Sequence, residues 1–127
     1  VDIVAAEDCT IMFLKGKKLL NTCDNGCEFH HTLIRNLLGI VAQNNMYLNQ
    51  KIKYTSRKTT REKLMAYLTD QAKMKSSNDF TIPFNRQELA DYLGVERSAM
   101  SAELGKLTKL GILQTQRSHF TLLRPLD

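Results

Sequence analysis

The sequence is poor in the residues that interrupt or crosslink a polypeptide chain. Its 127 residues include only 2 prolines and 3 cysteines, and no proline occurs between Val1 and Ile82. Because a proline inside a helix breaks or kinks it, this part of the chain can hold a long uninterrupted helix. The sequence also lacks any apolar run that approaches the roughly 20 residues needed to span a bilayer. We therefore expect no contact with a membrane.

The cysteines are too few and too scattered to form a disulfide framework. An odd number of cysteines outside a cysteine-rich domain indicates reduced thiols, and hence a cytoplasmic protein. Cys23 and Cys27 could share one face of a helix, and Cys9 would have to join them to hold a metal ion or an iron–sulfur cluster. Because two thiolates make only half of such a site, structural or incidental thiols are favoured over metal binding.

The composition is that of a globular protein with an excess of positive charge. Hydrophobic residues make up 43% of the chain, the formal net charge is +5 and the pI is about 9.2. Eight basic residues lie between Lys51 and Lys75, with only Glu62 and Asp70 to offset them. This distribution suits a polyanionic partner such as a nucleic acid. The acidic residues are scattered and no nucleophile sits in a recognisable turn, so we expect no enzymatic activity.

The stretch from Asn85 to Leu113 organises the rest of the chain. Apolar residues recur in it at the spacing of helix faces on both sides of Gly94. A glycine can take the left-handed conformation that ends a helix, and Asn85 with Glu88 forms a capping-box pair at a helix start. The sequence thus predicts two helices joined by a short turn, a helix-turn-helix. The apolar positions are Leu89, Ala90, Leu93, Val95, Met100, Leu104, Leu107 and Leu110.

The second helix of a helix-turn-helix can enter the major groove of DNA. Small or donor-bearing residues, which suit base edges, occupy its predicted solvent side. They are Arg97, Ser98, Ser101 and Ala102. The simpler alternative is a two-helix piece of an ordinary α-helical core. We favour the DNA-binding interpretation because the turn glycine, a stop glycine and a hairpin all fall at the expected places.

A hairpin follows the second helix directly. Gly111 is expected to end that helix, and Ile112–Gln114 and His119–Leu123 alternate like two short strands around Thr115–Ser118. Such a hairpin is the wing of a winged helix. A helix-turn-helix that is followed at once by a wing is far more specific for this fold than either element alone.

A long helix is predicted from about Cys27 to Tyr54, interrupted only by Gly39. Its narrow apolar stripe, with a polar break at Asn44 and Asn45, resembles the seam of a two-stranded coiled coil, in which a buried Asn can fix the register. The alternative is a helix that packs on its own domain. We favour a dimer because the chain offers too little else to cover the seam. The predicted dimer interface is Ile34, Leu37, Val41, Asn44, Leu48 and Ile52.

The first residues favour β-structure. Ile3–Ala6 and Cys9–Leu14 are rich in strand-forming residues, and we expect them to complete a sheet whose other strands lie elsewhere. Lys15–Lys18 is expected to be a turn that opens a short helix. Because the chain begins at Val1 without an initiator Met, we expect it to be the C-terminal part of a longer protein.

The segment between the long helix and the helix-turn-helix is expected to support the latter. Tyr54–Thr60 is a predicted hinge, in which Thr59 or Thr60 caps a helix over Arg61–Lys75. Phe80–Phe84 is a short strand that could pair with the wing, and Pro83 would keep it at a sheet edge. The apolar face of the supporting helix is Leu64, Met65, Tyr67, Leu68 and Ala72.

These elements in this order resemble the cyclic-AMP receptor protein/FNR (Crp/Fnr) family of bacterial transcription regulators. The likeness is strongest over residues 80–123, where FNRQELADYLGVERSAMSAELGKLTKLGIL is similar to the family's helix-turn-helix signature. VDIVAAEDCTIMFL looks like the last strands of its effector-binding β-roll. The resemblance implies a mainly α (α+β) fold in three parts. Residues 1–26 would be the end of a truncated, cupin-like β-roll, residues 27–54 a dimerisation helix, and residues 55–127 a winged helix-turn-helix DNA-binding domain.

The resemblance also implies which residues contact DNA. The four solvent-side residues of the second helix, from Arg97 to Ala102, fall on the family's base-contacting face. Ala102 departs from the Arg often found there, which removes a possible guanine contact, so the family's usual operator is not expected. Contacts to phosphate position a protein without specifying sequence. The expected phosphate contacts are Asn85, Gln87, Lys58, Arg117 and Ser118.

The effector is not identified by the sequence. In the cyclic-AMP receptor a Thr-Ser pair on the dimer helix meets the adenine, and here Leu48 and Asn49 occupy the matching positions. Cyclic AMP is therefore disfavoured, and these two residues are only weak candidates for an effector contact. Cys23 and Cys27 do not match the ligands of the iron–sulfur members. We expect no cofactor in this part of the protein.

The sequence therefore predicts a homodimeric, sequence-specific DNA-binding transcriptional regulator that responds to an effector in the intact protein. Two recognition helices about 34 Å apart would contact a pseudo-palindromic operator in double-stranded DNA. RNA polymerase is a further expected partner. Two alternatives stay open, a winged-helix protein-assembly module without DNA binding and an effector-independent repressor.

Overall fold

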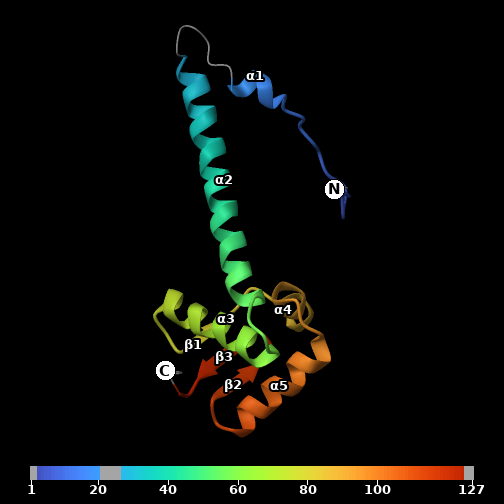
Figure 1. Ribbon diagram of the computed structural model, residues 1–127, viewed down its shortest axis with the longest axis vertical. Helices are drawn as coiled ribbons and strands as arrows, with labels where there is room; N and C mark the ends of the chain where they lie inside the picture. Colours follow the sequence, from blue (N-terminus) through green and yellow to red (C-terminus); the bar gives the residue numbers. More distant parts are fainter. Residues whose placement is uncertain (1–2, 21–26, 125–127) are drawn as a thin grey trace. The chain divides into compact units, whose positions relative to one another are not determined.

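Five helices and three strands follow one another in the order α1, α2, α3, β1, α4, α5, β2, β3 within the part of the chain that the structure describes (Figure 1). The structure is a computed structural model that describes residues 3–20 and 27–124. The chain divides into two units, Val1–Asn45 and Met46–Asp127. The strands and helices α3–α5 all belong to the second unit.

The first unit contains no strand among its described residues. Residues 3–15 form no regular element before helix α1 (Gly16–Leu20), so the predicted strands Ile3–Ala6 and Cys9–Leu14 are wrong for this structure. Their β-favouring side chains are exposed, Ile3 at 95% and Phe13 at 90%. A strand forms only where a neighbour satisfies its backbone hydrogen bonds. No other described residue pairs with this segment.

Helix α2 (Glu28–Thr55) is continuous over 28 residues and confirms the predicted long helix. The apolar side chains of its predicted seam are largely exposed, Val41 at 63%, Leu48 at 54% and Ile52 at 61%. Ile34 and Leu37 are partly buried. None of the described helices, α2 included, is long and apolar enough to cross a bilayer.

Helix α3 (Thr60–Lys75) begins with the cap that the sequence predicts. The Thr59 hydroxyl accepts a hydrogen bond from the Glu62 backbone N–H, and the Glu62 carboxylate accepts one from the Thr59 N–H. This capping box fixes where α3 begins. The predicted hinge Tyr54–Thr60 is too long at both ends, because Tyr54 and Thr55 belong to α2 and Thr60 begins α3. The predicted apolar face is confirmed, since all five of its residues are buried: Leu64, Met65, Tyr67, Leu68 and Ala72.

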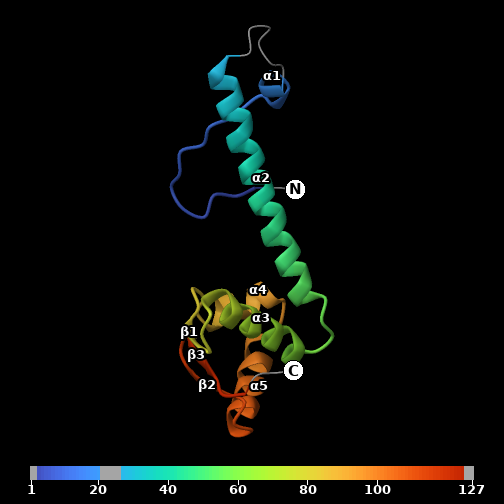
Figure 2. The same cartoon turned by 90° about the vertical axis from the view of Figure 1, so that its left-hand side faces the viewer.

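A three-stranded antiparallel sheet lies beside helices α3 and α5 (Figure 2). Strands β1 (Asp79–Thr81), β2 (Leu113–Gln116) and β3 (His119–Leu122) are arranged in the order β1-β3-β2. Phe80 pairs with Phe120, and Phe120 pairs with Thr115. The predicted pairing of the short strand with the wing is therefore confirmed, although β1 ends before Pro83.

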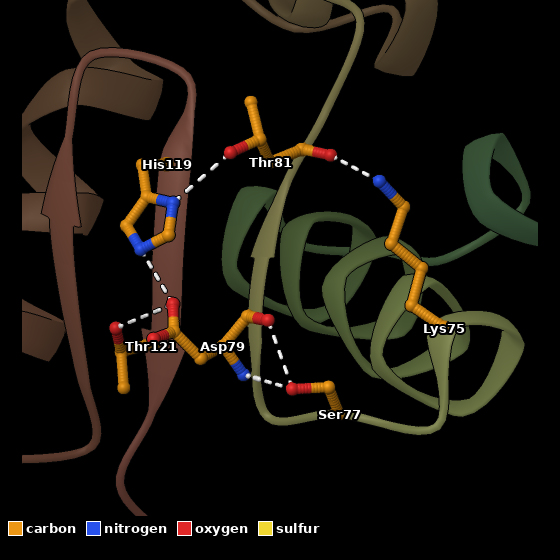
Figure 3. Close-up of polar contacts among 6 residues, drawn as sticks. All are labelled: Lys75, Ser77, Asp79, Thr81, His119 and Thr121. Carbon is orange, nitrogen blue, oxygen red and sulfur yellow. Dashed lines mark hydrogen bonds and ion pairs between the residues drawn. The ribbon is translucent and has the colours of Figure 1, made fainter.

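Polar side chains on the exposed face of this sheet join β1 to β3 (Figure 3). The His119 ring lies between two β1 residues, with Nε2 2.5 Å from the Asp79 carboxylate and Nδ1 3.0 Å from the Thr81 hydroxyl. Lys75, at the end of α3, donates a hydrogen bond to the Thr81 carbonyl. These contacts fasten the wing to the supporting helix.

The helix-turn-helix consists of α4 (Arg86–Leu93) and α5 (Arg97–Lys109). Gly94 lies between them in the left-handed conformation, with φ 60° and ψ 49°, and its N–H donates to the last carbonyls of α4. Gly111, with φ 67°, follows the end of α5. Both predicted glycine positions are confirmed. Leu110 was expected to belong to the buried stripe, but it lies after the last helical residue and is 56% exposed.

An aromatic cluster joins the end of α2 to α3 and α4 within the second unit. Tyr54 is 2% exposed, and its ring centroid lies 5.5 Å from that of Tyr67 in α3 and 6.2 Å from that of Tyr92 in α4. The Tyr54 hydroxyl donates to Asp70 over 3.1 Å. Burial raises the pKa of Tyr67 to about 12, so this phenol stays protonated at physiological pH. The last turn of α2 is thus part of the winged-helix core.

Two glycine substitutions test the turn against the helix. Gly94→Ala should lower the free energy of unfolding by about 1–2 kcal/mol, because a side chain disfavours the left-handed conformation. Gly105→Ala, inside α5 where an added Cβ meets no atom within 4 Å, should raise it by about 0.5–1 kcal/mol. Urea unfolding followed by circular dichroism measures both, and effects of the same sign would contradict the assigned conformations.

Candidate nucleic-acid interface

The start of α4 is built around the predicted capping box. The Asn85 side-chain oxygen accepts from the Glu88 N–H over 3.0 Å, and the Glu88 carboxylate accepts from the Asn85 N–H over 2.7 Å. The Gln87 amide donates to Asp91 one turn later in α4 over 2.9 Å. Asn85 therefore uses its side-chain oxygen to cap the helix, and both Asn85 and Gln87 remain exposed.

Helix α5 turns one face to the core and the other to solvent. Met100, Leu104 and Leu107 are buried at 4% exposure or less. The opposite face is exposed along its length, as the sequence predicts: Arg97, Ser98, Ser101 and Ala102. An ion pair of 2.5 Å between Arg61 in α3 and Glu103 holds the helix from its side. The core contacts and this ion pair therefore fix the position of the exposed face of α5.

Glu96 caps α5, which the sequence analysis missed. Its carboxylate accepts a hydrogen bond from the Ala99 N–H over 2.8 Å and another from the Ser98 hydroxyl. The Ser98 hydroxyl and these backbone donors lower the pKa of Glu96, which is therefore ionised at neutral pH. The signal was an acidic residue directly after the turn Gly94-Val95, at a helix end that favours negative charge.

The tip of the wing is a two-residue turn, Arg117–Ser118, and not the four-residue Thr115–Ser118 that was expected, because β2 extends to Gln116. Arg117 has φ 54°, and its side chain is exposed. The Ser118 hydroxyl donates to the Phe84 carbonyl over 2.8 Å. Ser118 thus fastens the wing tip to the residues that lead into α4.

Arg86 is a second residue that the sequence analysis missed. Its Nη2 donates to the Thr115 hydroxyl over 2.6 Å, and its Cζ lies 5.0 Å from the centroid of the Phe120 ring. Nη1 is buried and has no hydrogen-bond partner among the described residues. Desolvation lowers the pKa of this guanidinium, though an arginine remains charged. Arg86, the first residue of α4, therefore contacts both strands of the wing.

These elements meet at a shallow cleft of about 380 Å³ between the start of α4, the start of α5 and the wing tip. The residues that line it include three arginines and no acidic side chain. The cleft is lined by Arg86 and by five residues that the sequence predicts as DNA contacts. These five are Asn85, Gln87, Arg97, Arg117 and Ser118. A planar guanidinium suits the oxygens of a phosphate, so the cleft fits an anion of this kind.

The other predicted site residues lie outside this cleft. Ser98, Ser101 and Ala102 continue along the exposed face of α5. Lys58 is exposed in the short segment between α2 and α3, where its backbone N–H donates to Glu62 over 3.1 Å. Leu48 and Asn49 lie on exposed turns of α2. The Cys27 sulfur lies 2.9 Å from the His30 ring, whereas Cys23 lies outside the described residues.

Comparison with known proteins identifies one family model, described as a Crp-like helix-turn-helix domain, that matches residues 62–126, just over half of the chain. No curated protein matches the sequence. A solved structure described as a Crp/Fnr-family transcriptional regulator from Eubacterium rectale is 16% identical, with a TM-score of 0.49, and the match covers 79% of this chain and 44% of that one. The reduced (FeII) CO-sensing protein from R. rubrum is 17% identical, with a TM-score of 0.38, over 77% of this chain and 47% of that one. The chain spans less than half the length of either protein.

Two arginine substitutions separate a structural role from a surface role. Arg86→Ala should lower the free energy of unfolding by about 1–3 kcal/mol, because it removes a hydrogen bond and a cation–ring contact. Arg97→Ala, on the exposed face of α5, should change it by less than about 0.5 kcal/mol. Thermal unfolding measures both variants. Equal effects would mean that Arg86 does not join α4 to the wing.

Proposed function

This chain belongs to the family of proteins with a Crp-like helix-turn-helix domain, and we propose that it is a sequence-specific DNA-binding transcriptional regulator that acts in the cytoplasm as a homodimer. The observation that carries this proposal is the arginine-lined cleft beside the exposed face of α5. It places phosphate-binding groups and small groups that suit base edges on adjoining surfaces. Duplex DNA offers both kinds of partner side by side.

The cleft is proposed to hold a backbone phosphate. Its guanidinium groups come from α4, α5 and the wing, so one phosphate contacted there would fix all three elements on the duplex. Arg117 at the wing tip and Lys58 between α2 and α3 are exposed and are proposed to contact neighbouring phosphates.

The exposed face of α5 is proposed to contact base edges. Arg97 lies at both surfaces, because it lines the cleft and begins α5, so it contacts either a guanine or a phosphate. Ser101 and Ala102 are small, which lets the helix lie close to the floor of the major groove. The methyl group of Ala102 suits contact with the methyl group of thymine.

The homodimer is proposed to form along α2. Its seam leaves Val41, Leu48 and Ile52 more than half exposed, and an apolar stripe at coiled-coil spacing fits a second copy of itself. The exposed Asn44 would then face its counterpart and fix the register. Residues 27–54 are thus proposed as the dimerisation helix and residues 55–127 as the DNA-binding domain. Effector binding and contact with RNA polymerase remain predictions from the family resemblance.

Salt dependence tests the proposed DNA contact. The full chain should bind duplex DNA with an affinity that falls steeply with salt concentration, since each neutralised phosphate releases counterions. Arg117→Ala should reduce the slope of log K against log salt by about 1 for each protomer bound, because each loses one phosphate contact. The reduction should be the same for every DNA sequence. Arg35→Ala, which removes the same charge from α2, is the matched control and should leave the slope unchanged. Fluorescence anisotropy measures the slopes, and equal losses for both variants would contradict the proposed interface.

Arg97→Ala tests whether α5 contacts bases. If Arg97 binds a guanine, this variant should weaken binding to selected operators by about 1–3 kcal/mol and binding to random duplexes by much less. Equal losses on both kinds of duplex would make Arg97 a phosphate contact only.

A charge in the seam tests the homodimer. Leu48→Asp should shift the protein from dimer to monomer, because lost burial of two leucines alone costs about 3 kcal/mol or more, over a hundredfold in the dimer Kd. Gln43→Asp adds the same charge away from the predicted seam and should leave the dimer intact. Sedimentation equilibrium measures both variants. A monomeric parent chain, or equal dissociation of the two variants, would contradict the proposed seam.

A further inference from the structure

The first turn of α5 holds an interaction that constrains which base it contacts. The Ser98 hydroxyl donates a hydrogen bond to the Glu96 carboxylate, which also accepts from the Ala99 N–H. A serine hydroxyl has one hydrogen to donate and two lone pairs with which to accept. A carboxylate has no hydrogen to donate, so the hydrogen in this contact belongs to Ser98. Glu96 therefore takes up the only donor that Ser98 has.

With its hydrogen donated to Glu96, the Ser98 hydroxyl can only accept a further hydrogen bond through its oxygen. Ser98 and Glu96 are both exposed at the start of α5, so this pair of side chains presents only oxygen lone pairs to an approaching duplex, and the donors nearby belong to the exposed Arg97. In the major groove, guanine and thymine present acceptors at their O6, N7 and O4 atoms. Hydrogen-bond donors come only from the exocyclic amino groups of cytosine and adenine. An acceptor at Ser98 therefore matches two of the four bases.

The charge of Glu96 disfavours a phosphate, the ligand that the N-terminus of a helix often binds. The N-terminus of a helix favours phosphate because its N–H groups point outward and its dipole is positive there. In α5 the Glu96 carboxylate already occupies this place and caps the Ala99 N–H. A phosphate at the same point would meet a like charge. The capped N–H groups at the start of α5 are therefore not available to a backbone phosphate, and a phosphate in the neighbouring cleft would have to be bound by side chains such as that of Arg97.

Resting on the proposed function, we propose that Ser98 is a specificity-determining residue that accepts a hydrogen bond from the exocyclic amino group of a cytosine or an adenine. Glu96 is its positioning residue, since it fixes the direction of the hydroxyl without having to contact the base. Ser101, one turn further along α5, is not held by Glu96 in this way and carries no such restriction.

Selection of duplexes from a random pool tests this assignment. The full chain should enrich cytosine or adenine at one position of each half-site, and Ser98→Ala should lose the preference at that position alone. Glu96→Ser keeps a good cap for α5 but offers a hydroxyl that can donate as well as accept, so Ser98 is no longer restricted. That variant should also accept guanine or thymine there. Ser101→Ala is the matched control and should leave this position unchanged.

A base analogue gives a second measurement on the selected duplex. Replacing the selected adenine or cytosine by a nucleotide without the exocyclic amino group should weaken binding of the parent chain on the order of fivefold, the effect of one hydrogen bond. The same replacement should leave binding by Ser98→Ala unchanged. Thermal unfolding of each variant confirms that α5 remains folded.

Each other outcome overturns the assignment. If the position lost in Ser98→Ala carries guanine or thymine, or if Ser98→Ala changes no position, Ser98 does not act as an acceptor from an amino group and only this inference fails. If Ser98→Ala keeps the preference and Glu96→Ser loses it, the acceptor is Glu96. If the parent chain enriches no duplex at all, the proposed function fails together with the inference.

Discussion

The burial of Tyr54 between α3 and α4 is the interaction on which the winged helix depends. Its ring contacts Tyr67 and Tyr92 in an aromatic cluster, and its hydroxyl donates to Asp70, which also pairs with Lys53 over 2.5 Å. Aromatic residues provide large buried areas with restricted geometry. The last turn of α2 is therefore packed into the same core as the helix-turn-helix, and any contact that orients this turn also orients α4.

The candidate interface divides its polar side chains between structure and recognition. Capping contacts engage Asn85 and Glu96, and Arg86 is held between the two wing strands. Arg97 and Arg117 remain exposed beside them. Groups whose positions are fixed before a ligand arrives lose less conformational entropy on binding. The hydrogen bonds of the held residues thus fix the shape of the proposed interface, and Arg97 and Arg117 are proposed to contact DNA from it.

The sequence predicts what is local and fails where an interaction joins distant segments. The caps at Thr59 and Asn85 and the turn at Gly94 were predicted because each depends on residues within one helical turn. Arg86 was missed because its partners lie 29 or more residues later, on strands whose position only the folded sheet determines. The strands predicted over residues 3–14 did not form because strand propensity has no effect without a pairing partner.

We propose that α5 enters the major groove, with its position set by the core around Tyr54 and duplicated by the proposed dimer along α2. Hydroxyl-radical footprinting of the full chain on a selected duplex tests whether α5 lies in the major groove in this way. We expect two protected segments per site, centred about 34 Å apart on one side of the duplex, because two recognition helices would lie in successive major grooves. A single protected segment, or protection that does not depend on the sequence of the duplex, would contradict it.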